Sequence, residues 1–173
     1  DEISGLQRLR PHRDSGPKAP LTGVYLCADE FHADFTSHVR HGAPSSITRQ
    51  TTKGAVLNGV TGVFQGKFFV PRTVGQYTDA DMQHQALLLE EGAVVFAKPE
   101  LEIYADDVEC AHGNTSGALD PNQLFYMRQR GIPEAEARAL LTEAFVAEAL
   151  TEASKSVHDE LLGAARAFLA ETI

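Results

Sequence analysis

The sequence contains no tryptophan and only two cysteines, Cys27 and Cys110, among its 173 residues. Secreted scaffolds of this size usually carry more cysteines, so their scarcity indicates a reducing compartment, and we expect a cytoplasmic protein. One disulfide between the two cysteines is left open. No stretch reaches the roughly 20 apolar residues that span a bilayer, and the first residues lack the apolar segment of a secretory signal. A start at Asp1 rather than Met is typical of a piece of a longer protein.

Positive charge is scarce as well. Lys and Arg total 15, Asp and Glu total 24, and the formal net charge is −9. A nucleic-acid binder needs a clustered basic surface to displace counterions from phosphates, whereas the cationic residues here are scattered singly. An acidic membrane surface would repel the chain too. We therefore expect neither nucleic acid nor membrane as a partner.

Motifs for nucleotide binding and for common hydrolytic chemistry are also missing. The chain has no Gly-x-x-x-x-Gly-Lys-Ser/Thr, no Gly-x-Gly-x-x-Gly and no Gly-x-Ser-x-Gly. The acids Asp106 and Asp107 are adjacent, and adjacent residues of a strand point to opposite faces, which is poor geometry for a general acid/base pair. The sequence therefore predicts no catalytic residues and a protein that is not an enzyme by itself.

What the chain does contain is enough hydrophobic sequence, 43%, for a real core. Over residues 21–118 the apolar runs are short, rich in β-branched and aromatic residues, and bounded by Gly or Pro, which is typical of strands. Periodicity alone leaves a sandwich, a barrel and a β-helix open. Residues 1–20 are polar and proline-punctuated, so we expect a linker or a truncated first strand there, with Ile3, Leu6 and Leu9 as its apolar positions.

Residues 119–173 change to helical periodicity. Asp120-Pro121 supplies an N-cap followed by proline at the first helical position, and Gly131 is a typical stop. A second helix is predicted from Pro133, with an inward apolar stripe, and a third from about Ser156. The stripe includes Leu140, Leu141 and Phe145. Strands followed by a helical domain indicate an α+β fold.

Cys110 and His112 are the pair most able to carry chemistry. On a regular strand they point to the same face as neighbours, close enough to contact one metal atom or cluster. A buried thiol beside a hydrogen-bonded histidine is the plainer interpretation of a Cys-x-His pair. Two ligands do not complete a tetrahedral site, so a metal would need further groups from elsewhere or from another chain.

A second histidine group contains His32, Asp34, His38 and His41. At about 3.3 Å per residue, His32 and His38 lie about 20 Å apart on a straight strand, too far to share a metal. We therefore expect a solvated strand face, with His41 on the opposite side.

Several stretches together resemble the SufD branch of the SufB/SufD family, which belongs to the SUF system of iron–sulfur cluster assembly. The matches are collinear, cover roughly residues 21 to 150, and are most specific from Lys98 to Gly113. The chain departs from the usual family pattern at Ala111, where serine is more usual, and at Asn114, where alanine is more usual. The matching stretches are His32–Asp34, Thr36–Pro44, Lys53–Gly54, Val63–Lys67, Gln85–Leu89, Lys98–Val108, Cys110–Gly113, Gln123–Tyr126 and Arg130–Ile132.

The resemblance is to the C-terminal part of such proteins, and it implies a right-handed parallel β-helix followed by a small helical domain. It also implies a scaffold subunit that works in a complex with SufB and the ATPase SufC. The end of the β-helix would meet SufB, with His112 as candidate iron ligand and Cys110 beside it. The helical domain would dock the ATPase near Phe125, Tyr126, Arg130 and Gly131. An iron–sulfur cluster would be present only transiently and in the full complex, with none in this chain alone.

Two alternatives stay open at the level of sequence. One is an independent β-helix enzyme acting on carbohydrate, an architecture that needs carboxylates and cations along a groove. The other is a structural dimerisation module without chemistry, which would form a homodimer.

Overall fold

The structure is a computed structural model, and it describes residues 18–28, 31–57, 59–73 and 76–173. In the described residues, strands come first and helices follow. The strands are β1 (Lys18–Cys27), β2 (Ala33–Arg40), β3 (Ile47–Val56), β4 (Thr61–Val70), β5 (Asp79–Leu88), β6 (Val94–Ile103) and β7 (Glu109–Gly117). The helices are α1 (Pro121–Arg128), α2 (Glu134–Ala147), the 3-10 helix η1 (Glu148–Leu150) and α3 (Lys155–Thr172). No helix among these is long and apolar enough to cross a membrane.

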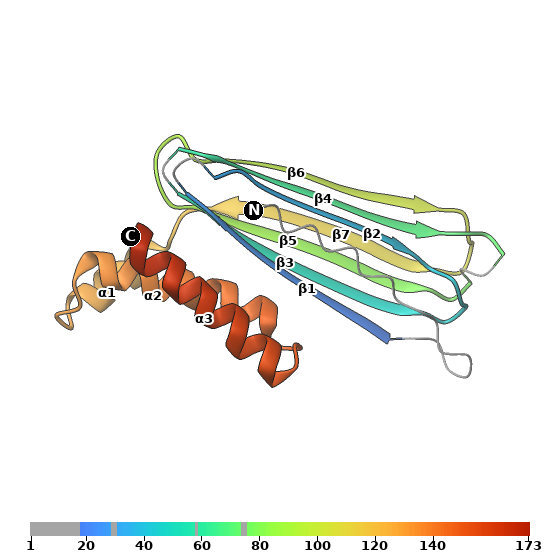
Figure 1. Cartoon of the computed structure of the whole chain (residues 1–173). Coiled ribbons are helices and arrows are strands. Elements are labelled where there is room, and N and C mark those ends of the chain that lie inside the picture. The colour runs from blue at the N-terminus through green and yellow to red at the C-terminus, as the bar shows by residue number, and fades with distance from the viewer. Residues whose placement is uncertain (1–17, 29–30, 58, 74–75) are drawn as a thin grey trace.

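Successive strands alternate between two sheets, and each strand pairs in parallel with the strand two places along the chain. One sheet has four strands in the order β1-β3-β5-β7, and the other has three in the order β2-β4-β6. Figure 1 shows the two sheets as facing layers joined by turns at both ends. The chain therefore winds as a parallel β-helix of about three turns, which confirms the architecture that the family resemblance predicted.

The space between the two sheets is filled by alternate residues of every strand. The register sets these residues in rows, and Thr48 of β3 lies beside Ala80 of β5, which lies beside Cys110 of β7. Two apolar clusters occupy the interior, and in each of them buried or partly buried side chains from both sheets pack together. The clusters contain Tyr25, Cys27, Val56, Phe64, Phe68, Ala80 and Met82.

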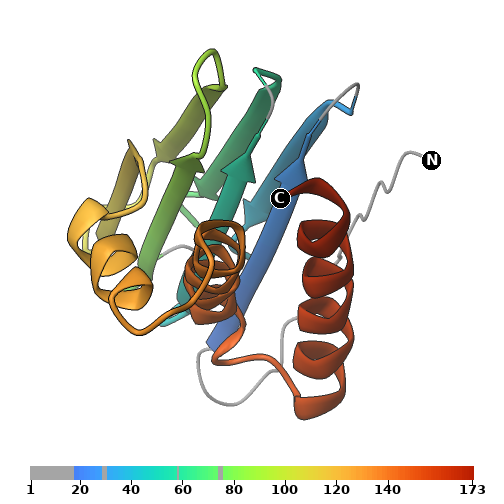
Figure 2. The same cartoon turned by 90° about the vertical axis from the view of Figure 1, so that its left-hand side faces the viewer.

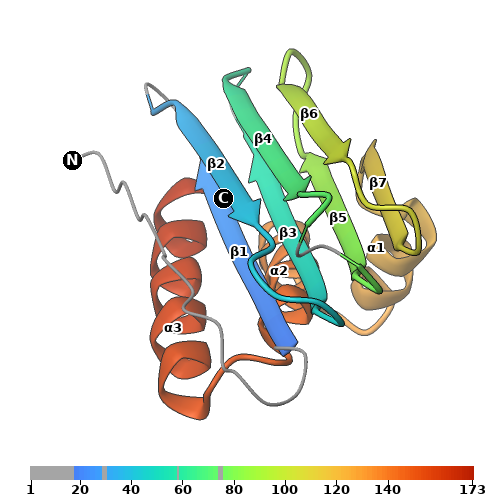
Figure 3. The ribbon, with the colours of Figure 1, turned by 90° about the vertical axis from the view of Figure 1, so that its right-hand side faces the viewer.

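Among the described residues, the helices cover the outer face of the four-stranded sheet near the carboxyl ends of its strands, and no helix lies on the outer face of the other sheet (Figures 2 and 3). Their apolar side chains, including Phe145 and Phe168, pack on a cluster built from outward-facing Ala55, Leu57 and Leu87. The predicted N-cap is confirmed, because the Asp120 carboxylate accepts a hydrogen bond of 2.8 Å from the backbone N–H of Asn122. The carboxyl ends of β3 and β5 are therefore buried on both faces.

One sequence-based expectation needs correction. Leu140 is 42% exposed, so it does not belong to the inward stripe of α2; Ala137, Thr142 and Val146 are the buried residues of that helix. The reason is helical geometry: at about 100° per residue, Leu140 lies nearly opposite the buried Thr142 on α2 and therefore points away from the covered face. At the other end of the chain, β1 begins at Lys18, inside the segment 1–20; Ile3, Leu6 and Leu9 lie outside the described residues.

Candidate functional site

Cys110 and His112 lie on the inner face of β7, the edge strand of the four-stranded sheet. The register sets Cys110 opposite Ala80 and His112 opposite Met82, two residues of β5 that are fully buried in the interior. Neighbouring strands are about 4.8 Å apart, and alternate residues of one strand share a face. The prediction that the two side chains are neighbours is therefore consistent with a regular β7.

The Cys110 thiol is half-buried against the interior cluster of Phe64, Phe68 and Met82. Burial raises the pKa of the Cys110 thiol above its ordinary value, and a backbone hydrogen bond with Ala80 partly offsets this rise. Cys27 is also a free thiol, fully buried on β1 at the far edge of the same sheet. The open question of a disulfide is thus answered: the two cysteines are not bonded.

His112 is exposed, because no further strand of the described residues pairs with β7 on its outer side. Together, Cys110 and His112 provide one sulfur and one nitrogen that could bind a metal ion at this edge. Within the described ranges no group of three or more His, Cys, Asp or Glu side chains is placed to hold a metal ion. The pair is therefore an incomplete coordination sphere, since zinc or iron in such sites takes about four ligands.

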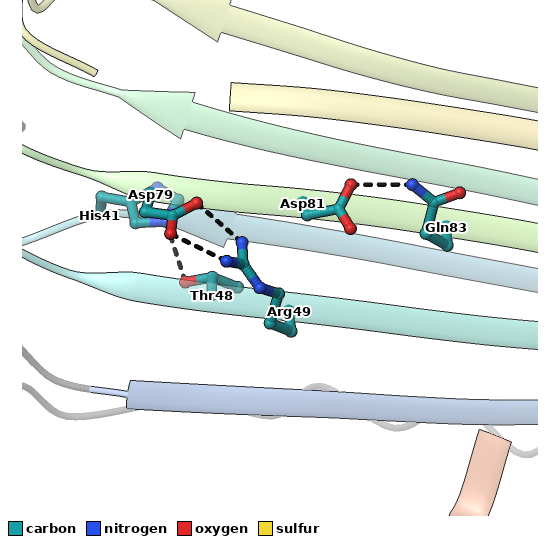
Figure 4. A network of polar contacts seen from close by, with 6 residues as sticks. All are labelled: His41, Thr48, Arg49, Asp79, Asp81 and Gln83. Carbon is teal, nitrogen blue, oxygen red and sulfur yellow. Dashed lines mark hydrogen bonds and ion pairs between the residues drawn. The ribbon is translucent and has the colours of Figure 1, made fainter. Parts of the chain in front are cut away.

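A second polar network lies on the outer face of β3 and β5, in the same four-stranded sheet (Figure 4). Arg49 donates two hydrogen bonds, of 2.7 and 2.8 Å, to the two carboxylate oxygens of Asp79, and Gln83 donates one of 2.8 Å to Asp81. The Asp79 carboxylate raises the pKa of the Arg49 guanidinium further above its usual range. Both carboxylate oxygens of Asp79 accept hydrogen bonds from Arg49. We therefore interpret this network as a solvent-exposed ion pair and not as the site of a catalytic acid.

The histidine group of the N-terminal half is divided by the fold. Asp34 and His38 are exposed on the outer face of β2, as the solvated-face interpretation predicted. His41, by contrast, is buried, and its ring bonds to Thr48 Oγ1 at 3.0 Å through Nε2 and to the carbonyl of Phe69 at 3.3 Å through Nδ1. Burial lowers the pKa of His41, so this histidine is a neutral interior residue.

Tyr25, His84 and Asn114 form a hydrogen-bonded chain that residue types and spacing did not predict. Tyr25 Oη lies 2.9 Å from His84 Nε2, and His84 Nδ1 lies 2.6 Å from Asn114 Oδ1. His84 is fully buried, and its ring stacks on Phe64 with the ring centroids 4.3 Å apart. A signal was available, because alternation along β5 gives His84 the same face as Ala80, Met82 and Ala86.

The helical residues predicted to bind a partner lie on a separate surface. Phe125 and Tyr126 of α1 are 63% and 61% exposed, and no residue of α1 is buried. The Arg130 guanidinium lies 3.7 Å from the centre of the Tyr126 ring and donates a hydrogen bond to its hydroxyl. Gly131 has a φ of +82°, which glycine adopts without steric cost. The two aromatic rings are thus presented to solvent, and one of them is held by an arginine.

These features define a class of protein: a short parallel β-helix with helices on one outer face and a thiol and an imidazole on one open edge. A family model for the SUF system iron–sulfur cluster assembly SufBD core domain matches residues 11–145. The chain therefore belongs to the SufBD family of iron–sulfur cluster assembly proteins, and the resemblance noted in the sequence is confirmed.

Three relatives illustrate the similarity. The chain is 41% identical over 120 residues to the iron–sulfur cluster assembly protein SufD of Escherichia coli, which covers 69% of this chain and 28% of that protein. It is 34% identical over 140 residues to a SufBD family iron–sulfur cluster assembly protein of Synechocystis, covering 81% of the chain and 31% of the relative. It is 37% identical over 131 residues to the chloroplastic protein ABCI7 of Arabidopsis thaliana, covering 75% and 27%. The chain thus spans about a third or less of the length of these curated relatives.

Proposed function

We propose that this chain is part of a non-catalytic scaffold subunit on which an iron–sulfur cluster is assembled, in a complex with SufB and the ATPase SufC. Family membership supports the assembly role and gives no support to the carbohydrate-active alternative. The observation that carries the proposal is the placement of Cys110 and His112 on the inner face of the exposed edge strand β7. Thiolate and imidazole are both ligands that iron accepts.

The proposal assigns the missing ligands to the partner. An edge strand presents unpaired N–H and C=O groups to which another chain adds by backbone hydrogen bonds. β7 is such an edge, and a SufB subunit that docks along it would bring its own side chains to His112 and Cys110. The cluster is then cargo held between two subunits, with its iron and sulfide supplied to the complex and carried onward.

Substitution of His112 tests this role. His112→Ala and His112→Gln each remove the imidazole nitrogen from an exposed side chain, so the fold should be retained. In the purified three-subunit complex we expect iron and sulfide contents to fall at least about fivefold, while the complex stays assembled. His38→Gln is the matched control, because His38 is also an exposed strand histidine but lies on the outer face of β2. Normal iron and sulfide in both His112 variants, with only a lowered melting temperature, would make His112 a structural residue.

For the ATPase, we propose a docking surface on α1 centred on Phe125 and Tyr126, with Arg130 and Gly131 at its end. Two exposed aromatic rings close together, one stacked with arginine, are the residue types enriched in binding hot spots. Elsewhere on the helical domain, α2 and α3 leave three further large apolar side chains partly exposed. These are Leu140, Val157 and Leu161.

Point substitutions test the docking surface better than removal of the helices, because the helices bury the apolar outer face of the four-stranded sheet. Phe125→Ser and Tyr126→Ser are expected to weaken ATPase capture by about tenfold or more each, the usual loss at an aromatic anchor. Phe96→Ser is the matched control, since Phe96 is 64% exposed on the bare outer face of the three-stranded sheet. Equal capture by all three variants would contradict this docking surface.

A further inference from the structure

Asn114 follows His112 by two residues on β7, so the two side chains share the inner face of the open edge. The Asn114 side chain is hydrogen-bonded to the interior, because its Oδ1 lies 2.6 Å from Nδ1 of the fully buried His84. His84 is held in turn by Tyr25, whose hydroxyl lies 2.9 Å from Nε2. One chain of hydrogen bonds therefore runs from β1 through β5 to the edge strand.

The direction of this chain follows from the donors and acceptors. An amide oxygen only accepts, so His84 Nδ1 carries the proton and donates to Asn114. Nε2 is then the bare nitrogen, and it accepts from the Tyr25 hydroxyl. Burial lowers the pKa of His84, which keeps the ring neutral and makes this single tautomer compatible with both contacts.

The hydrogen-bonded series Tyr25–His84–Asn114 is also rigid. Tyr25 crosses β3 at Gly54, where an added Cβ would lie 2.1 Å from the Tyr25 ring, so only glycine leaves room for it. The His84 ring stacks against Phe64 on one side, and its plane lies within 8° of the Phe64 plane. A ring fixed by stacking and by two hydrogen bonds has little freedom to turn, and neither has the carboxamide that it holds.

We propose that His84 is a positioning residue that fixes the Asn114 carboxamide, so that its NH₂ group is a fixed hydrogen-bond donor to sulfur held at the Cys110–His112 edge. The oxygen of the carboxamide is occupied by His84, so the two N–H donors are the part left for a ligand. The acceptor class is electron-rich sulfur, either cluster sulfide or a thiolate bound to iron. Hydrogen bonds to such sulfurs tune cluster stability and potential. This inference rests on the proposed function.

The first test determines which nitrogen of His84 is protonated, in protein that carries no cluster. In protein labelled with ¹⁵N-histidine, the nitrogen shifts of His84 at neutral pH should be those of a neutral ring protonated at Nδ1. Asn114→Ala should change this pattern, because the acceptor is lost, while Ser116→Ala should leave it unchanged. Ser116 is the matched control, since it lies two residues further along the same face of β7. A ring protonated at Nε2 would reverse the chain, turn the carboxamide oxygen outward and overturn the proposal.

The second test uses the three-subunit complex loaded with ferrous iron and sulfide, and it measures how fast a chelator removes the iron. Asn114→Ala is expected to speed release about tenfold, the effect of losing one hydrogen bond to a charged acceptor. His84→Leu should give a similar increase, and the double variant should be no faster than Asn114→Ala, because the two residues act as one unit. Ser116→Ala should release iron at the unmodified rate.

The outcomes separate this inference from the proposed function. If the unmodified complex takes up no iron and sulfide, the proposed function fails and the donor role fails with it. If uptake is normal and Asn114→Ala releases iron within about twofold of the unmodified rate, only the donor role is overturned; fully additive effects of the two substitutions also overturn it. Asn114 lies on an exposed edge, so Asn114→Ala decides the matter even where His84→Leu does not fold.

Discussion

The ammonium group of Lys53 on β3 forms an ion pair with the carboxylate of Glu148 in η1, 95 residues later in the chain. The lysine side chain is only 5% exposed, and its charge also lies 4.3 Å from the centre of the Phe145 ring. This pair is one of the polar contacts that join the helices to the β-helix beside the apolar cluster; in another, the Arg138 guanidinium of α2 donates a hydrogen bond of 2.6 Å to the Leu89 carbonyl. The Lys53–Glu148 pair fixes where η1 sits on the sheet.

Glu148→Gln should therefore destabilise the protein, because it leaves a buried ammonium without its counter-charge. Glu148 is 71% exposed, and water screens the pair from that side, so we expect a loss of about 1 kcal/mol rather than the larger cost of a fully buried pair. Urea unfolding measures the change. Lys53→Met, which removes the charge and keeps the apolar stem, should cost less than Lys53→Ala; the reverse order would contradict this account.

Gly54→Ala and Gly163→Ala should have opposite effects. At Gly54 the new Cβ meets the Tyr25 ring at 2.1 Å, so the substitution should cost about 1–3 kcal/mol, as overpacked cores do. At Gly163, in α3, nothing lies within 4 Å of the new Cβ, and alanine should stabilise by about 0.5–1 kcal/mol through its higher helix propensity. Thermal unfolding of both variants checks the pair, and Gly54→Ala at full stability would show that Tyr25 does not cross there.

Stability should fall as the pH is lowered from 7.5 to 5.5, because burial lowers the pKa values of His41 and His84 in the folded state. The unfolded chain takes up protons below its ordinary histidine pKa of about 6.5, and the folded chain does so only at lower pH. The stabilisation is thus complete above about pH 6.5 and is lost progressively below it. His41→Gln should make the free energy of unfolding less dependent on pH in this range, and an unchanged slope would contradict the assignment.

Thr78→Val should be neutral or stabilise by up to about 1 kcal/mol. Within the described part of the chain, Thr78 Oγ1 is a buried atom without a hydrogen-bond partner, and a methyl group in its place avoids the cost of removing a hydroxyl from water. Thr48→Val is the matched control, since the Thr48 hydroxyl bonds to His41 and its loss should cost about 1–3 kcal/mol. Equal losses in the two variants, measured by urea unfolding, would mean that Thr78 has a partner.

Part of the candidate site could be predicted from residue types and spacing alone. The alternation of side chains along a strand predicted that Cys110 and His112 lie on the same face of β7. Their pairing with the buried residues Ala80 and Met82 is consistent with that prediction. The buried chain through His84 could not be predicted with the same ease, because its three members come from three separate strands. Alternation shows that His84 points inward, but it does not show what the ring meets there.

The amino-acid sequence by itself determined the local structure and the family. Short runs bounded by glycine predicted the strands, Asp120-Pro121 predicted where α1 begins, and the stretch from Lys98 to Gly113 predicted the SufBD family. Only the tertiary structure decided which strands stack and which side chains meet. Each strand of the β-helix pairs with the strand two places away, so Tyr25, His84 and Asn114 come together through a register that local propensity does not encode. The exposure of Leu140 was decided in the same way, by which helix face the sheet and α3 could cover.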